Sequence, residues 1–159
     1  MNLEEGDECF MELTFSRRWK HVSVVRTFLQ SFLSVNFPQG KQTTPERVAM
    51  AVSELMENAV KYASDEGIRV GLTVSSGHEP LLKVTIENPA DAEAVQTVER
   101  LYSRVMAGEP IATYLEMMLE AATRAESHSH LGLIRIRCES GCRLGLETEP
   151  ELVRFILEL

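Results

Sequence analysis

The stretch SELMENAVKYAS, residues 53–64, carries the pattern on which the fold prediction depends. At about 100° per residue, the apolar positions of this region fall in one sector of a helix; they are Val48, Val52, Leu55 and Ala59. Glu54 and Asn58 lie one turn apart on the flank of that sector, and Glu57 and Lys61 point away from it. An asparagine inside a helix needs a reason, because its amide competes for backbone hydrogen bonds. The stretch therefore predicts a core helix whose flank is either ordinary polar surface or a binding site.

The composition predicts one globular domain, residues 1–159. The chain has a net charge of −8, with 44% hydrophobic and 25% charged residues, which is ordinary for a single domain of this length. An acidic surface repels a phosphate backbone, so nucleic acid is not an expected partner. No apolar run approaches the roughly 20 residues that span a bilayer. The acidic residues 1–10 predict no signal peptide, and three cysteines without a paired framework favour free thiols in a reducing cytoplasm.

Hydrophobic periodicity predicts alternating groups of strands and helices. Period-two alternation predicts strands at 9–16, 68–74, 81–87, 142–148 and 152–159. Helical spacing predicts helices at 19–35, from 45 to 64, and at 90–107, 110–126 and 130–140. This order favours an α+β two-layer sandwich, with a mixed or antiparallel sheet covered on one face by helices.

Two helix ends carry recognisable signals. Thr43 or Thr44 can cap the helix of the opening stretch, with Pro45 in its first turn and Glu46 placed for a capping box. Gly141 is expected just after the end of the helix at 130–140. Residues 90–126 add two helices with many apolar side chains, which either pack into the core or form a docking face for a partner.

The polar flank belongs to a longer pattern, E-L-x-x-N-A-x-K-Y, within residues 54–62. The pattern resembles the asparagine box of the histidine-kinase-like (GHKL) ATPase superfamily. Residues 45–64 resemble most closely the anti-sigma-factor serine/threonine kinases of bacterial partner-switching systems, and the weaker resemblance extends over most of the chain. It implies the histidine-kinase-like ATPase fold, binding of ATP and Mg²⁺, and a helical lid or insert at about 90–126.

The resemblance also implies roles for individual residues. Asn58 would ligate Mg²⁺ through its side-chain oxygen, which suits a cation that takes only one or two protein ligands. Glu54 would be the catalytic base that orients or deprotonates the attacking group. Lys61 would lie near the phosphates as a point charge, or it is a solvated surface lysine.

Two glycine-rich boxes of that family are altered in this chain. The adenine-binding D-x-G-x-G corresponds to TIENPAD, residues 85–91. Glu87 or Asn88 occupies the aspartate position, and no glycine follows. Asn88 would accept from adenine through its side-chain oxygen, or it is a turn residue before Pro89. The second box reads SHSHLGLIRI, residues 127–136, where the resemblance places His130 and Gly132 at the nucleotide, beside a helix N-terminus.

Three functional hypotheses follow from these observations. The first is an ATP- and Mg²⁺-dependent serine/threonine protein kinase, or anti-sigma-type switch protein, that acts on a small antagonist protein. The second is a catalytically inactive module of the same fold that sequesters a signalling partner without nucleotide. The third, ranked last, is a phosphotransfer subunit that uses one of its histidines as acceptor: His21, His78, His128 or His130. A homodimer is left open in each case.

A structural zinc site is the least favoured reading of the chain. His128 and His130 stand near Cys138 and Cys142 in the sequence. The C-x-x-x-C spacing straddles a predicted helix end, and no second thiol or carboxylate pair accompanies it.

Overall fold

The computed structural model describes residues 8–37, 43–75, 81–123 and 130–159. Within these ranges five strands form one sheet in the order β1-β2-β3-β5-β4, and all four pairings are antiparallel. The strands are β1 (Glu8–Phe15), β2 (Ile68–Ser75), β3 (Leu81–Pro89), β4 (Arg143–Glu149) and β5 (Leu152–Glu158). The helices are α1 (Trp19–Asn36), α2 (Pro45–Tyr62), α3 (Ala92–Ala107), α4 (Pro110–Thr123) and α5 (Gly132–Glu139). The predicted α+β class and two-layer arrangement are confirmed, with an antiparallel rather than a mixed sheet.

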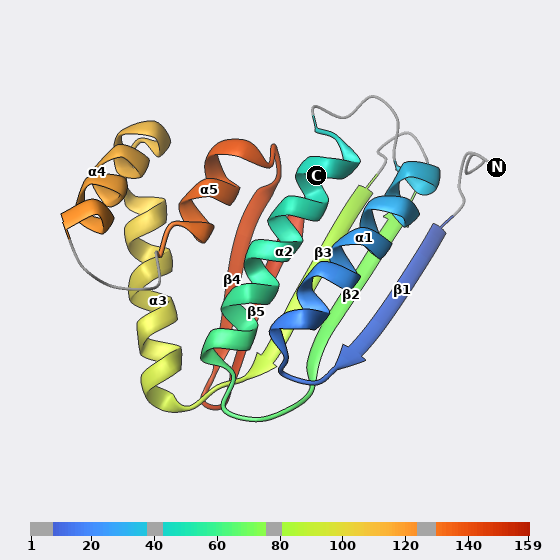
Figure 1. Ribbon diagram of the computed structural model, residues 1–159, viewed down its shortest axis with the longest axis horizontal. Coiled ribbons are helices and arrows are strands. Elements are labelled where there is room, and N and C mark those ends of the chain that lie inside the picture. Colours follow the sequence, from blue (N-terminus) through green and yellow to red (C-terminus); the bar gives the residue numbers. More distant parts are fainter. Residues whose placement is uncertain (1–7, 38–42, 76–80, 124–129) are drawn as a thin grey trace.

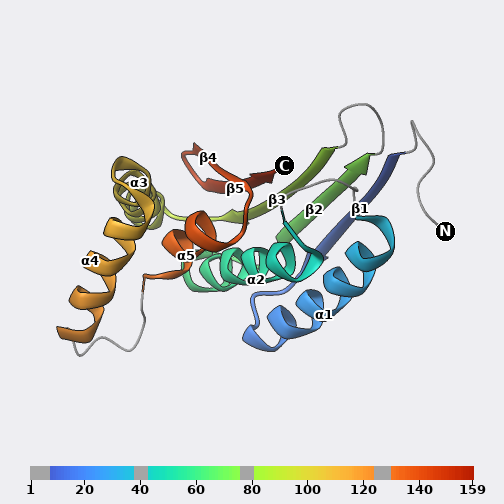
Figure 2. The same cartoon turned by 90° about the horizontal axis from the view of Figure 1, so that it is seen from above.

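The helices divide into two groups around this sheet. Helices α1, α2 and α5 cover one of its faces (Figures 1 and 2), whereas α3 and α4 lie beyond the β4 edge. The helix predicted at 110–126 is described as far as Thr123, and the one predicted at 130–140 begins at Gly132, after a turn at His130 and Leu131. The described part of the predicted insert, residues 90–123, therefore adds two helices beside the β4 edge of the sheet.

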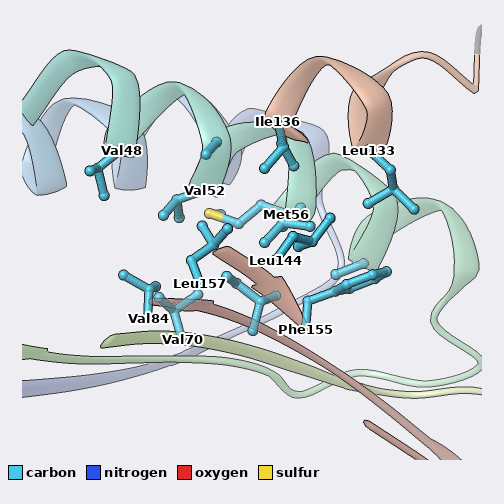
Figure 3. Close-up of a cluster of buried hydrophobic side chains, with 14 of the residues drawn as sticks. Val48, Val52, Met56, Val70, Val84, Leu133, Ile136, Leu144, Phe155 and Leu157 are labelled. Atoms are coloured by element: carbon cyan, nitrogen blue, oxygen red, sulfur yellow. The ribbon is translucent and has the colours of Figure 1, made fainter. Parts of the chain in front are cut away.

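The hydrophobic core fills the space between the sheet and the helices that cover it (Figure 3). Helices contribute buried Val48, Val52, Met56, Leu133 and Ile136, and strands contribute buried Val70, Val84, Leu144, Phe155 and Leu157. Each such side chain contributes about 1.5–3 kcal/mol when it leaves water. The apolar sector predicted for α2 thus packs against the sheet and forms the centre of the core.

The first turn of α2 is capped differently from the prediction. Thr44 is the N-cap residue, and its side chain accepts a hydrogen bond from the backbone N–H of Arg47 at 3.4 Å. Glu46 is therefore the second residue of the helix, one position too early to complete a capping box. Thr43 is buried instead, and its hydroxyl donates to the carbonyl oxygen of Ser140 at 2.5 Å. That bond ties the start of α2 to the end of α5.

The other face of the sheet carries charged side chains rather than helices. Arg69 on β2, Glu87 on β3, Arg154 on β5 and Glu147 on β4 stand opposite one another in register. Their ion pairs measure 3.3 Å for Arg69 with Glu87, 2.5 Å for Glu87 with Arg154, and 2.8 Å for Arg154 with Glu147. Opposite charges paired across strands suit a solvated face. This row explains why the sheet needs helices on one side only.

Polar contacts hold the peripheral helices to the rest of the molecule. The Tyr102 hydroxyl on α3 donates to the Leu144 carbonyl on β4 at 3.1 Å. The Arg137 guanidinium on α5 donates to the carbonyls of Val105 and Gly108, at the end of α3, at 2.6 and 2.8 Å. A cation at the C-terminus of a helix satisfies carbonyls that lack a helical partner.

Candidate functional site

Helices α2 and α5 meet at an ion pair that includes the predicted catalytic base. The Glu54 Oε1 atom lies 2.9 Å from Arg135 Nη1, and Arg135 Nε lies 3.2 Å from Glu139 Oε2. Gly132 sits against the same carboxylate, because a Cβ atom added there would lie 2.8 Å from Glu54 Oε2. The structure therefore brings Glu54 and Gly132 together, and their roles at a nucleotide stay predictions.

A second contact between the same two segments lies near the end of α2. The hydroxyl of Tyr62 lies 3.2 Å from His130 Nδ1, and the Lys61 ammonium lies 5.0 Å from the centre of the Tyr62 ring. All three side chains are half-buried, and burial raises the pKa of the Tyr62 phenol. Lys61 and His130, both predicted ligands of a nucleotide, are thus next to the same tyrosine.

Asn58 lies between these two contacts on the same flank of α2. It is half-buried, one turn after Glu54 and one turn before Tyr62. Its neighbour Glu57 has a raised pKa, first because of burial and then because of repulsion by Glu54; Arg135 opposes the shift. The name α2–α5 polar cluster is used below for Glu54, Asn58, Lys61, Tyr62, His130, Gly132 and Arg135.

Two members of the polar cluster had no role in the sequence prediction. Arg135 was not singled out, although a cation three residues after Gly132 on one helix faces the same neighbour. Tyr62 was read only as part of a motif. A contact between residues 81 positions apart, such as Arg135 with Glu54, leaves no local pattern in the sequence.

Asn88, the predicted adenine ligand, occupies a different environment from the polar cluster. It lies at the end of β3 with 2% of its surface exposed, and its amide donates to the carbonyl of Pro89 at 3.0 Å. The same carbonyl accepts from the N–H of Ser64 after α2. Asn88 is therefore a buried strand residue and not the turn residue of the alternative interpretation, and adenine binding by Asn88 stays a prediction.

Several of the predicted ligand residues fall outside the part of the chain that the structure describes. Ser127, His128 and Ser129 of the second box, and His78, lie outside the described residues. Among those described, no group of three or more His, Cys, Asp or Glu side chains is placed to hold a metal ion. Mg²⁺ does not require such a group, since it usually keeps several waters and phosphate oxygens as ligands. In the same ranges, no helix is both long and apolar enough to cross a membrane.

Helix α4 presents a second candidate site, on the surface of the molecule. Its exposed large apolar residues are Ile111, Leu115, Met118 and Leu119, with 64, 56, 44 and 70% of their surface exposed. They are spaced i, i+4, i+7 and i+8, so they form one continuous face, called here the α4 stripe. Thr113 and Met117 are the buried positions of the same helix. Within the described residues these four side chains have no apolar cover, so the alternative of a docking face stays open for this helix.

The comparisons with known proteins give one kind of match. No family model matches the chain, and no curated protein matches it either. Among solved structures it resembles a chain in "The crystal structure of SiaB-SiaC complex from Pseudomonas aeruginosa", with a TM-score of 0.64 and 14% sequence identity. The match covers 94% of this chain and 89% of that chain. At this identity the likeness establishes a shared α+β fold.

These findings correct the family resemblance drawn from the sequence. No family model supports the histidine-kinase-like ATPase superfamily, and the solved structure that the chain resembles comes from the SiaB-SiaC complex. The motif was misleading for a physical reason. Leu55 and Ala59 are core residues of an amphipathic helix, and Glu54 is held by Arg135. An acid and an amide on the flank of such a helix do not by themselves define a family.

Proposed function

We propose that this protein is a regulatory protein that acts by forming a non-covalent complex with another protein, as in a partner switch. The α4 stripe is the observation that carries this proposal. Its four large side chains lie on one helix face and have no apolar cover within the described chain. Leaving such side chains in water forfeits about 25 cal/mol for each Å² of apolar surface. Contiguous exposed apolar patches of this kind mark protein interaction sites.

The fold likeness supports the same proposal. The similar solved chain comes from a crystal structure of a two-protein complex and matches over 94% of the present chain. A fold hosts many functions, so the argument depends on the surface and not on the likeness. The surface has the right architecture for docking, because α4 is a regular helix fixed to α3 by the Arg104–Glu120 ion pair at 2.5 Å.

Photocrosslinking in the native cells tests this function. A photoreactive benzoylphenylalanine is placed at position 115, and in separate chains at the exposed positions 28 on α1 and 10 on β1. The expected result is one discrete crosslinked protein, identified by mass spectrometry, which then forms a complex with the purified chain in calorimetry. Absence of a specific crosslink from all three positions would contradict a function in partner binding.

Binding of ATP with Mg²⁺ at the α2–α5 polar cluster is the second candidate function, with phosphoryl transfer to the partner as its catalytic form. The observation that favours it is that Glu54, Asn58, Lys61, His130 and Gly132 all lie along one contact of α2 with α5 and the turn before it. The Asn58 oxygen would hold the magnesium ion, which neutralises phosphate charge when bound. Lys61 would supply a positive charge. Glu54 would orient the attacking hydroxyl.

The Glu54–Arg135 ion pair sets a condition on that second function. One oxygen of the Glu54 carboxylate makes an ion pair with the Arg135 guanidinium at 2.9 Å, which fixes the direction of the side chain. Glu54 would have to leave Arg135 before it could act as a base. Calorimetric titration with MgATP is the test. We expect Asn58→Ala to abolish Mg²⁺-dependent binding, and Glu54→Ala to keep binding while stopping transfer. Equal affinity in wild type and Asn58→Ala would remove Asn58 from the site.

A further inference from the structure

We infer that the partner presents to the α4 stripe an amphipathic helix whose apolar face is bordered by lysine and arginine. The inference rests on the proposed function and adds the chemistry of the partner. It follows from three properties of α4: the shape of the stripe, the charge beside it and the rigidity with which the helix is held.

The shape of the stripe selects a helical partner. Ile111 and Leu119 are eight residues apart, so the stripe extends about 12 Å along the helix axis. At about 100° per residue its four side chains cover a sector about 100° wide. A ridge of this form packs into the groove of another helix, as in the interaction of helices within proteins. An extended peptide would need a free strand edge, which a helix does not offer.

The charge beside the stripe selects a basic partner. Residues 110–123 contain two glutamates, Glu116 and Glu120, and neither lysine nor arginine. Glu120 is paired with Arg104 on α3, whereas Glu116 is exposed and borders the stripe beside Leu119, three residues further on. A second copy of this chain would bring Glu116 toward another acidic α4, in a molecule of net charge −8. Like charges at an interface cost free energy, whereas lysine or arginine at the same place gives a complementary border.

The stripe is also held in a fixed orientation. The Glu109 carboxylate accepts from the N–H of Ala112 at 2.9 Å and so caps the start of α4. Arg104 on α3 makes two hydrogen bonds to Glu120, at 2.9 and 2.5 Å. Met117 is buried at the same time on the opposite side of α4. A surface that is already ordered loses less conformational entropy on binding than a surface that must be ordered first.

Fluorescence anisotropy with three synthetic peptides tests the inference on the full chain. The first is a labelled 18-residue Leu/Lys peptide that forms a helix with one apolar face. The second keeps its leucines and replaces every lysine with glutamate. The third has the composition of the first with its leucines distributed around the helix. We expect the first peptide to bind at least about tenfold more tightly than the others, a ratio that corresponds to about 1.4 kcal/mol.

Two matched variants locate the binding surface. Leu115→Ser with Leu119→Ser removes half of the stripe without changing the charge, and we expect about tenfold weaker binding of the basic helix. Val24→Ser with Val35→Ser removes two similarly exposed apolar residues from α1 and should leave binding unchanged. Glu116→Lys should weaken binding as well, because it reverses the acidic border.

Each alternative result has a defined meaning. Equal binding of the scrambled basic peptide overturns the inference by showing attraction to net charge alone. An equal loss in the α1 variant overturns it by showing that the apolar contact is not specific to the stripe. Tight binding of the acidic helix overturns it too. A sedimenting dimer that Leu115→Ser with Leu119→Ser dissociates would assign the stripe to a second copy of the chain. If a partner crosslinks at position 28 or 10 and not at 115, the regulatory function stands and the helical docking site fails.

Discussion

At the scale of single residues, Gly132 leaves room for the Glu54 carboxylate that a larger residue would not leave. A Cβ at position 132 would meet the Glu54 carboxylate at 2.8 Å, and that carboxylate is held by Arg135. Alanine otherwise suits a helix better than glycine by up to about 1 kcal/mol. The lack of space beside the Glu54 carboxylate therefore favours glycine at position 132, whereas the helix itself would favour alanine.

A double-mutant cycle at these two residues tests that balance. In the Glu54→Ala background, Gly132→Ala should stabilise the protein by about 0.5–1 kcal/mol, because the methyl group then meets only the Cβ of residue 54, at an ordinary 3.6 Å, and the helix gains. In the wild-type background the displaced carboxylate should cancel that gain, so the coupling between the sites should be about 1 kcal/mol. Urea unfolding followed by circular dichroism measures the free energy of unfolding of each variant. An identical effect of Gly132→Ala in the two backgrounds would show that the contact has no energetic weight.

Glu57 gives a prediction for the pH dependence of stability. Its pKa is raised above the ordinary 4.5, first by partial desolvation of a side chain that is still exposed at the surface, and then by repulsion from Glu54. The folded chain therefore holds this proton more tightly than the unfolded chain, and the free energy of unfolding falls as pH rises through the folded pKa. Glu57→Gln should stabilise the protein at pH 7, and the advantage should shrink as the pH is lowered toward 4. If the stabilisation by Glu57→Gln grew as the pH was lowered, the pKa of Glu57 would be lowered in the folded protein and not raised. Unfolding midpoints at several pH values measure it.

At the scale of elements, the end of α5 depends on a glycine in the left-handed conformation. Gly141 has φ +71°, directly after the C-cap residue Ser140. Gly141→Ala should destabilise the protein by about 1–2 kcal/mol, since a Cβ is strained in this region. Gly145→Ala is the control: it lies in β4 with only ordinary contacts at 3.6 Å and should cost little or nothing. Thermal unfolding of both variants would contradict this account if their midpoints fell equally.

The elements also show how far local sequence patterns reach. All five helices and all five strands within the described residues were predicted by periodicity, because α2 and the central strands alternate or repeat cleanly. The capping box at Glu46 failed by one residue, since either threonine could act as cap. The partner of Glu54 and the exposure of Leu115 depend on contacts far along the chain. The motif at Asn58 suggested a family that the comparisons do not support.

At the scale of the whole molecule, stability should be unequal between the two groups of helices. Helix α2 buries ten of its residues, whereas α4 buries Thr113 and Met117 only. Both α3 and α4 lie outside the layer that covers the sheet (Figure 1). Elements with few buried contacts open with a lower free energy than the core. We therefore expect α4 to open without the core when it does open, although its folded form presents the stripe in one orientation.

Arg137 connects α5, which covers the sheet, to the end of α3. Its removal should destabilise the peripheral helices α3 and α4 without destabilising the helices that cover the sheet. Its guanidinium donates to the carbonyls of Val105 and Gly108, so Arg137→Leu leaves both without this partner. Hydrogen bonds from a charged group contribute about 1.5–3 kcal/mol. Hydrogen exchange of α4 amides should therefore accelerate about tenfold or more, while α2 amides keep their wild-type rates. The control is Arg100→Leu, an exposed arginine on α3 whose guanidinium contacts Thr97 on the same helix, which should change neither rate. Equal acceleration in α2 and α4 would show that the molecule opens as one unit, and the separate role of the peripheral helices would then be wrong.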